Sequence, residues 1–196
     1  QSYVFGCQVA EVEVDTVTGE VQVLGIWAAH DVGRAVNPQG IEGQIEGGIA
    51  QALGQSLMED YKLDGGRTST SGFAKYILPT SLDMPQVNSI IVEDPDPTGP
   101  LGVKGVGELS LVPTAPAITN AIYDAVGVRI DEVPITPEKI LRALESPSKR
   151  CGPKTVPDFA WHDPIRVPTP WEGGAGPGPV AARREGELAI HGQGAI

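Results

Sequence analysis

The sequence predicts an α+β domain, in which antiparallel strands pack against helices, followed by an extended segment rich in proline and glycine. Near the N-terminus apolar residues alternate with polar ones, the period of a half-buried strand, and further on they recur every four residues, the period of a helix. Residues 1–146 hold 8 Lys and Arg against 20 Asp and Glu, whereas residues 147–196 hold 6 against 5 together with 8 of the 18 prolines. We therefore divide the chain into a domain at 1–146 and a tail at 147–196.

The overall composition excludes several classes of protein. The 196 residues carry a formal net charge of −11, which argues against nucleic acid or an anionic membrane as partner, because both require a basic surface. The sequence contains no run of 18 apolar residues that would predict a membrane span. Two cysteines are too few for a disulfide framework or a zinc site, and they suit a reducing cytoplasm. We expect a cytoplasmic chain in which Cys7 is a buried apolar side chain and Cys151 a free thiol of the tail.

The first two elements read as a β-hairpin. From Val9 to Val14 the apolar residues alternate with Glu11 and Glu13, a turn follows at 15–19, and residues 21–27 run back as a second strand.

A helix is predicted at 40–59. Four glycines lie in its interior, Gly43, Gly47, Gly48 and Gly54, each costing about 1 kcal/mol relative to alanine. Such a helix is expected to be approached closely by another backbone or by a bulky ligand. The apolar stripe that predicts the helix consists of Ile41, Ile45, Ile49, Leu53 and Leu57.

The rest of the domain contains shorter elements. A polar loop is expected at 60–72, and helices at 113–126, ended by Gly127, and from Pro137 to Glu145, capped by Thr136. Strands are predicted at 74–80 and 87–92. The tail shows no periodicity, and its aromatic residues among prolines favour either contact with a partner surface or plain disorder.

Between residues 102 and 108, three glycines adjoin a lysine and end at Glu108. Glycines allow backbone N–H groups to point into one concavity, which suits an oxyanion or a polar heterocycle, although a glycine-rich turn before a helix has the same composition. The spacing fits neither the phosphate-binding loop nor the dinucleotide fingerprint. Glu108 is a candidate general base, or only a favourable partner of the following helix dipole.

Other polar residues allow a functional and a structural reading. Gln44 and Gln51 could bind the edge of a pterin or purine, because an amide both donates and accepts, or could simply be solvated. His30 could be a base or ligand, or a structural residue at a strand end. The acidic run at 93–96 could hold calcium, although its prolines favour a solvated turn.

Five motifs in order give the first 144 residues a family resemblance. They are Val-Ala-Glu-Val-Glu-Val-Asp at 9–15 with Thr18-Gly19, Ala-His-Asp-Val-Gly-Arg at 29–34 with Asn37-Pro38, Glu-Gly-Gln-Ile-Glu-Gly-Gly at 42–48, Asp-Pro-Thr-Gly-Pro at 96–100 and Gly-Val-Gly-Glu at 105–108. With these motifs the chain resembles the C-terminal portion of the molybdenum-binding subunit of the xanthine dehydrogenase / aldehyde oxidoreductase family, the molybdenum hydroxylases.

The resemblance implies a role for each matching residue. Glu108 corresponds to the catalytic glutamate, which takes a proton from the hydroxyl group at the molybdenum. Gln44 corresponds to the glutamine that hydrogen-bonds the pterin. Lys104, Gly105, Val106 and Gly107 correspond to the backbone stretch that lines the pterin. No residue of this chain is expected to ligate the metal.

The resemblance also implies cofactors and partners. The cofactor is molybdopterin with molybdenum, usually as the cytosine dinucleotide in bacterial relatives, and 2Fe-2S clusters and FAD are expected on partner chains only. Many relatives continue Glu-Pro-Pro where this chain has Glu108-Leu109-Ser110, and the family's molybdenum-binding chain is several times longer. We therefore expect a split subunit or a fragment, completed by another chain, that hydroxylates an N-heterocycle or aldehyde with water as oxygen source. The alternative is a non-catalytic scaffold that binds partners through its tail.

Overall fold

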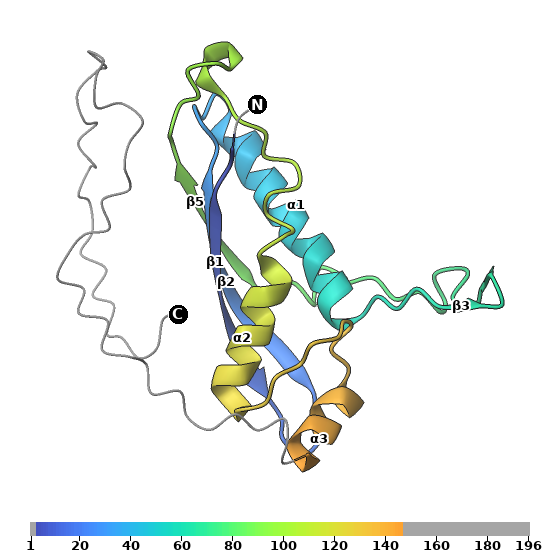
Figure 1. The fold of residues 1–196 in the computed structure, drawn as a ribbon. Helices are drawn as coiled ribbons and strands as arrows, with labels where there is room; N and C mark the ends of the chain where they lie inside the picture. The colour runs from blue at the N-terminus through green and yellow to red at the C-terminus, as the bar shows by residue number, and fades with distance from the viewer. Residues whose placement is uncertain (1–2, 147–196) are drawn as a thin grey trace. The chain divides into compact units, whose positions relative to one another are not determined.

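The computed structural model describes residues 3–146, so the predicted tail at 147–196 lies outside the described residues and the boundary between the two remains a prediction. The α+β class is confirmed (Figure 1). In chain order the elements are β1 (Gly6–Val14), β2 (Val21–Asp31), α1 (Pro38–Leu57), β3 (Leu63–Asp64), β4 (Arg67–Thr68), β5 (Gln86–Val92), the 3₁₀ turn η1 (Pro100–Gly102), α2 (Thr114–Val126) and α3 (Pro137–Glu145).

The main sheet has three strands in the order β1-β2-β5. β1 and β2 pair antiparallel, which confirms the predicted hairpin, but β5 pairs parallel with β2. The sheet is therefore mixed, and the expectation of antiparallel strands holds for the hairpin only. A parallel pair needs a long crossover connection, and α1, with its 20 residues, supplies it here.

An irregularity in the hairpin decides which side chains of β2 face the core. Glu11 pairs with Gly25 and Val12 with Val23, so Leu24 is an extra residue on β2. Such a bulge changes the phase of the alternation. Beyond it the inward side chains of β2 are Ile26, Ala28 and His30, and Asp31 at the end of the strand is also buried.

One face of the sheet is covered by α1 and α2 (Figure 1). The predicted stripe of α1 is confirmed, because its three central members are fully buried and its two ends pack against the core. α1 begins after Asn37, whose side chain accepts a hydrogen bond from the Gly40 amide at 3.1 Å. α2 ends at Gly127, as predicted. The fully buried core residues that β2, α1 and α2 contribute are Ile26, Ala28, Ile45, Ile49, Leu53, Ile118 and Ile122.

The short final helix α3 has the predicted bounds, and it adds Ile140 and Ala143 to the buried residues. Thr136 stands at the N-cap position in extended conformation, but its side chain accepts no capping hydrogen bond from the helix backbone.

The strand predicted at 74–80 is wrong. This segment consists of a turn and irregular backbone, in which the amides of Lys75 and Tyr76 both donate to the carbonyl of Gly72. Pro79 has no N–H to donate to a strand partner, which disfavours a ladder at this end of the run. The preceding polar loop holds the small β3–β4 hairpin, which projects away from the end of α1 (Figure 1).

The face of the sheet opposite the helices is exposed among the described residues. It carries the apolar side chains Val9, Leu24, Trp27, Ile90 and Val92, and the carboxylates of Glu11 and Glu13 stand at outward positions of the same strand as Val9. Cys7 lies in register with these outward positions and is exposed, so its prediction as a buried side chain is wrong. Among the described residues, no helix has the length and apolar character that crossing a membrane requires.

Candidate functional site

The segment between β5 and α2 carries the candidate site, and its first half is fastened to the end of β2. The Lys104 amide donates to the Val32 carbonyl at 3.0 Å, and the Arg34 amide donates to the Gly102 carbonyl at 2.9 Å. Gly33 lies between them with φ +67°, and a Cβ there would stand 2.3 Å from the Gly102 carbonyl oxygen. Only glycine allows the two backbones to lie this close.

The side chain of Lys104 strengthens the same junction. Its Nζ lies 2.6 Å from Oδ2 of Asp31 and 3.2 Å from Oδ2 of Asp94, and only 6% of the side chain is exposed. Burial by itself would lower the pKa of Lys104, but the hydrogen bonds to Asp31 and Asp94 outweigh it and raise that pKa above its ordinary value. Both the amide and the ammonium of Lys104 are therefore bound within the chain.

The four backbone amides that follow Lys104 have no hydrogen-bond acceptor in the described part of the chain. They are the N–H groups of Gly105, Val106, Gly107 and Glu108. No heavy atom lies within 4 Å of the position that a Cβ on Gly105 would take, while Val106 packs against the hydrophobic core. Backbone donors left free beside open space can bind an anion or a polar ring. We call residues 105–108 the cradle.

Two side chains border this cradle. Glu108 is exposed, and its carboxylate makes no hydrogen bond or ion pair with any of residues 3–146. Gln44 on α1 is also exposed, and its Oε1 lies 4.0 Å from where a Cβ on Gly107 would stand. The structure therefore brings the predicted Gln44 to the predicted glycine segment.

The glycines of α1 divide into two kinds. A Cβ on Gly48 would lie 1.9 Å from Oγ of Ser110, so the segment after Glu108 packs directly on the helix backbone at this point. Gly43 and Gly47 have no atom within 4 Å of the equivalent position. The close approach predicted for this helix is thus made by the chain itself at Gly48 and at Gly54, where a Cβ would lie 2.8 Å from Cδ of Pro79, and space remains open at Gly43 and Gly47.

A buried polar network holds the far end of the segment, at Ser110. The amide nitrogen of Gln8 donates to the Ser110 carbonyl at 2.8 Å and lies 3.1 Å from Nε2 of His30. The Thr114 hydroxyl lies 2.6 Å from Oε1 of Gln8 and 2.8 Å from the same carbonyl. The Ser110 hydroxyl donates to the Gln44 carbonyl at 3.3 Å. This network joins β1, β2, α1 and α2 around Ser110.

His30 is a fully buried member of that network. Burial lowers its pKa below the ordinary value, so the neutral ring is favoured. Its Nδ1 has no hydrogen-bond partner among the described residues. The structural reading of this residue fits these contacts, because they tie it to the packing of β1 against β2.

The remaining candidates lie outside the cradle. Gln51 is exposed on α1 about 10 Å along the helix from Gln44. In the acidic run, Asp94 pairs with Lys104, and Asp96 accepts from the amide and hydroxyl of Thr98 in a turn. The described residues hold no cluster of three or more His, Cys, Asp or Glu side chains suited to a metal ion.

The residues that hold the cradle in place were not predicted from the sequence, namely Gln8, Asp31, Ser110 and Thr114. One signal was available for Gln8, since it is a polar residue at an inward position of an alternating strand. An inward polar side chain must find a partner in the core, and here the partner is the segment that carries Glu108.

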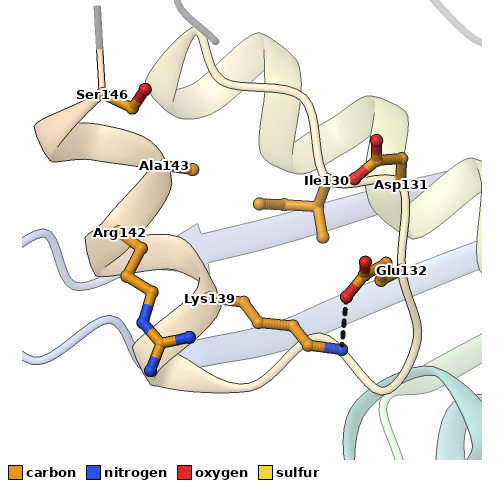
Figure 2. A pocket seen from close by; sticks show the side chains of 7 residues that line it. All are labelled: Ile130, Asp131, Glu132, Lys139, Arg142, Ala143 and Ser146. Atoms are coloured by element: carbon orange, nitrogen blue, oxygen red, sulfur yellow. Dashed lines mark ion pairs between the residues drawn. The ribbon is translucent and has the colours of Figure 1, made fainter.

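A separate cavity of about 260 Å³ lies between α3 and the residues that precede it (Figure 2). Lys139 and Glu132 form an ion pair across it, with 3.6 Å between Nζ and Oε2. It shares no residue with the cradle, and its lining consists of Ile130, Asp131, Glu132, Lys139, Arg142, Ala143 and Ser146.

Comparison with known proteins identifies relatives of this chain. Residues 1–85 match the family model of a molybdopterin cofactor-binding domain. The chain is 41% identical over 143 residues to a probable xanthine dehydrogenase subunit of Bacillus subtilis, a match covering 73% of this chain and 19% of that protein.

Solved structures show the same fold. Quinoline 2-oxidoreductase from Pseudomonas putida 86 matches with a TM-score of 0.65 and 39% identity, over 69% of this chain and 18% of that chain. Aldehyde oxidoreductase from Desulfovibrio gigas matches with a TM-score of 0.67 and 38% identity, over 73% of this chain and 16% of that chain. The chain thus spans less than a fifth of the length of these relatives. By sequence and by fold, it is a homologue of part of the molybdenum-binding subunits of the xanthine dehydrogenase / aldehyde oxidoreductase family.

Proposed function

We propose that the chain forms one wall of the molybdenum–pterin site of a molybdenum hydroxylase and contributes Glu108 as its catalytic base. The observation that carries the proposal is the free, exposed carboxylate of Glu108 at the end of a stretch of four unpaired backbone N–H groups within the described part of the chain. In the proposed enzyme the four N–H groups are hydrogen-bond donors to the cofactor and the Glu108 carboxylate is the base. A further part of the molybdenum-binding subunit would cover them and complete the site.

The residues present fit a molybdopterin. Gly105, Val106 and Gly107 offer N–H donors, the amide of Gln44 adds a side chain that both donates and accepts, and Gly43 and Gly47 leave space beside it on α1. Lys104 offers the cofactor no free donor, because its amide is bound to the Val32 carbonyl and its ammonium to Asp31. Its role is to hold the start of the glycine segment in place. The cytosine dinucleotide form is the form we propose.

The bound molybdenum group would supply the oxygen-transfer and two-electron chemistry of the hydroxylation. The chain's own part is proton transfer and orientation. A general base must lie within hydrogen-bond reach of the proton that it accepts, and among residues 3–146 the Glu108 carboxylate has no partner that would compete for this role. The substrate would be an N-heterocycle, purine-like by preference, or an aldehyde, with water as the oxygen source.

The proposal requires partner chains. The chain spans 19% of its Bacillus subtilis relative, so the other walls of the site and the contacts to the far side of the substrate belong to additional polypeptide. Electrons would leave through 2Fe-2S clusters, and in some complexes FAD, on further subunits. We propose a cytoplasmic hetero-oligomer in which this chain is a split subunit or a fragment of the molybdenum-binding subunit.

The test is Glu108→Gln in the complex that co-purifies with the chain. Hypoxanthine, quinoline and benzaldehyde serve as probe substrates with a dye as electron acceptor, and molybdenum and released cytidine nucleotide are assayed in parallel. We expect turnover per molybdenum to fall at least about 10³-fold with unchanged metal content, because loss of a base removes its whole contribution. Glu20→Gln, an exposed carboxylate in the hairpin turn, is the matched control.

Two outcomes would contradict the proposal. Near-normal turnover of Glu108→Gln would remove this residue from the mechanism. Absence of both molybdenum and cytidine nucleotide from the complex would favour the scaffold alternative.

A further inference from the structure

The position of Glu108 depends on neighbours, because its own side chain is bound to nothing among the described residues. Glu108 lies in a run of turns between Gly105 and α2, and the one hydrogen bond that its backbone makes within residues 3–146 is accepted by its carbonyl from the Leu111 amide at 3.2 Å. A segment with so few bonds of its own has the conformation that its attachment points impose. The nearest attachment after Glu108 is Ser110, two residues on.

Ser110 is held by three elements at once. Its carbonyl accepts from Gln8 on β1 and lies within hydrogen-bond distance of the Thr114 hydroxyl at the start of α2. Its hydroxyl donates to the Gln44 carbonyl on α1. Ser110 and Thr114 are fully buried, so these bonds are shielded from water.

Gln8 is the member of the network that joins the segment to the sheet. Its amide nitrogen contacts both His30 and the Ser110 carbonyl, and its amide oxygen faces the Thr114 hydroxyl. The neutral His30 ring on the neighbouring strand can accept at Nε2, which orients the amide so that the nitrogen also reaches Ser110.

We propose that Gln8, oriented by His30 and Thr114, is a positioning residue that sets the place of Glu108 through the Ser110 carbonyl. This inference rests on the proposed function for its catalytic consequence, but its structural part concerns residues 105–113 alone. Loss of the Gln8 amide leaves the Thr114 hydroxyl as the remaining donor to the buried Ser110 carbonyl and removes the hydrogen bond that joins the turn to the sheet.

The direct test is amide hydrogen exchange of the full chain, together with its co-purifying subunits, in Gln8→Leu. Within the peptide covering residues 105–113, we expect the amides of the buried Ser110 and the hydrogen-bonded Leu111 to exchange about tenfold faster, because the turn that shields them loses a buried hydrogen bond. Gln22→Leu changes an exposed glutamine of the same hairpin and should leave that peptide at the wild-type rate. Equal rates in the two variants would overturn the inference.

The catalytic test uses the same variants and the three probe substrates. We expect Gln8→Leu to lower kcat per molybdenum by about 10²-fold with little change in KM or molybdenum content, because a small misplacement of a reacting group has an effect of this size. In a Glu108→Gln background, Gln8→Leu should add no further loss, since both changes remove the same contribution. A merely structural role would lower molybdenum content and leave kcat per molybdenum unchanged.

The outcomes separate the two proposals. If Glu108→Gln abolishes turnover but Gln8→Leu does not lower kcat per molybdenum, the positioning role is wrong and the proposed function stands. If Glu108→Gln keeps its turnover, the proposed function fails, and hydrogen exchange still decides the structural part. Should Gln8→Leu not fold, Thr114→Val removes a partner at constant shape, with Thr114→Ser as the rescuing variant in both assays.

Discussion

The Nζ atom of Lys104 lies 2.6 Å from Oδ2 of Asp31, and the two side chains are only 6% and 7% exposed. Asp31 is the last residue of β2, and Lys104 immediately precedes the glycines of the cradle. This buried pair therefore fixes the start of the cradle to the sheet, as Ser110 fixes its end. The glycine segment is anchored on both sides and free only in its middle.

Replacing one member of this pair should destabilise the fold strongly. In Lys104→Met the Asp31 carboxylate is left buried without its cation, and we expect the free energy of unfolding to fall by about 3–5 kcal/mol. Chemical denaturation measures this change. The matched control is Lys62→Ala, whose pair with Asp60 is 65% and 40% exposed and should be worth less than about 1 kcal/mol. Equal losses in the two variants would contradict the anchoring role.

Two adjacent glycines of α1 should respond in opposite ways to alanine. Gly48→Ala places a Cβ 1.9 Å from Oγ of Ser110, so we expect a loss of about 1–3 kcal/mol from forced repacking. Gly47→Ala meets open space, and we expect a gain of up to about 1 kcal/mol from helix propensity. Thermal unfolding of the two variants distinguishes them. A loss at both positions would show that the segment after Glu108 packs differently.

The stability of the chain should decrease on acidification because of His30. Burial holds the pKa of His30 below its ordinary value of 6.5, whereas the unfolded chain keeps the ordinary value. As the pH falls below about 6.5 the unfolded state takes up this proton first, so the free energy of unfolding declines until the pH reaches the folded pKa. Urea unfolding between about pH 7.5 and about pH 5 measures the decline, and His30→Gln should reduce it. An identical pH dependence in the variant would exclude this origin.

Cys7 should react with thiol reagents. Its side chain is exposed on the open face of the sheet, so we expect maleimide to modify it in the chain purified without partners. Peptide mass spectrometry locates the adduct, and Cys7→Ser provides the control because it should lose that adduct alone. Protection of Cys7 in the isolated chain would mean that this face is covered.

Much of the fold could be predicted because its signals are local. A short stretch of sequence is enough to identify the hairpin and the apolar stripe of α1. The same holds for the Pro and Gly residues at the ends of α2 and α3. Pairing between distant strands has no such signal, so the parallel partnership of β2 and β5 was missed. At Cys7 the alternation was recognised, but its phase was not, because outward positions of this strand also carry apolar residues such as Val9.

The candidate site was predictable in its composition and only partly in its geometry. The glycines and Glu108 lie within a few residues of one another, and Gln44 reaches them because α1 packs beside the segment. The ion pair of Lys104 with Asp31 could not be predicted from the sequence, because the two residues lie 73 positions apart. Gln8 and Ser110 are 102 residues apart, and only the folded chain shows that they meet.

The parallel pairing of β2 with β5 also determines the order in which the strands can pair during synthesis of the chain. The hairpin is complete once residue 31 has left the ribosome, but the third strand cannot be added before residue 92 follows. In between, the projecting β3–β4 hairpin contributes nothing to the buried core. A backbone cut or an insertion at its tip should therefore be tolerated, and two pieces separated there could still assemble into the same domain.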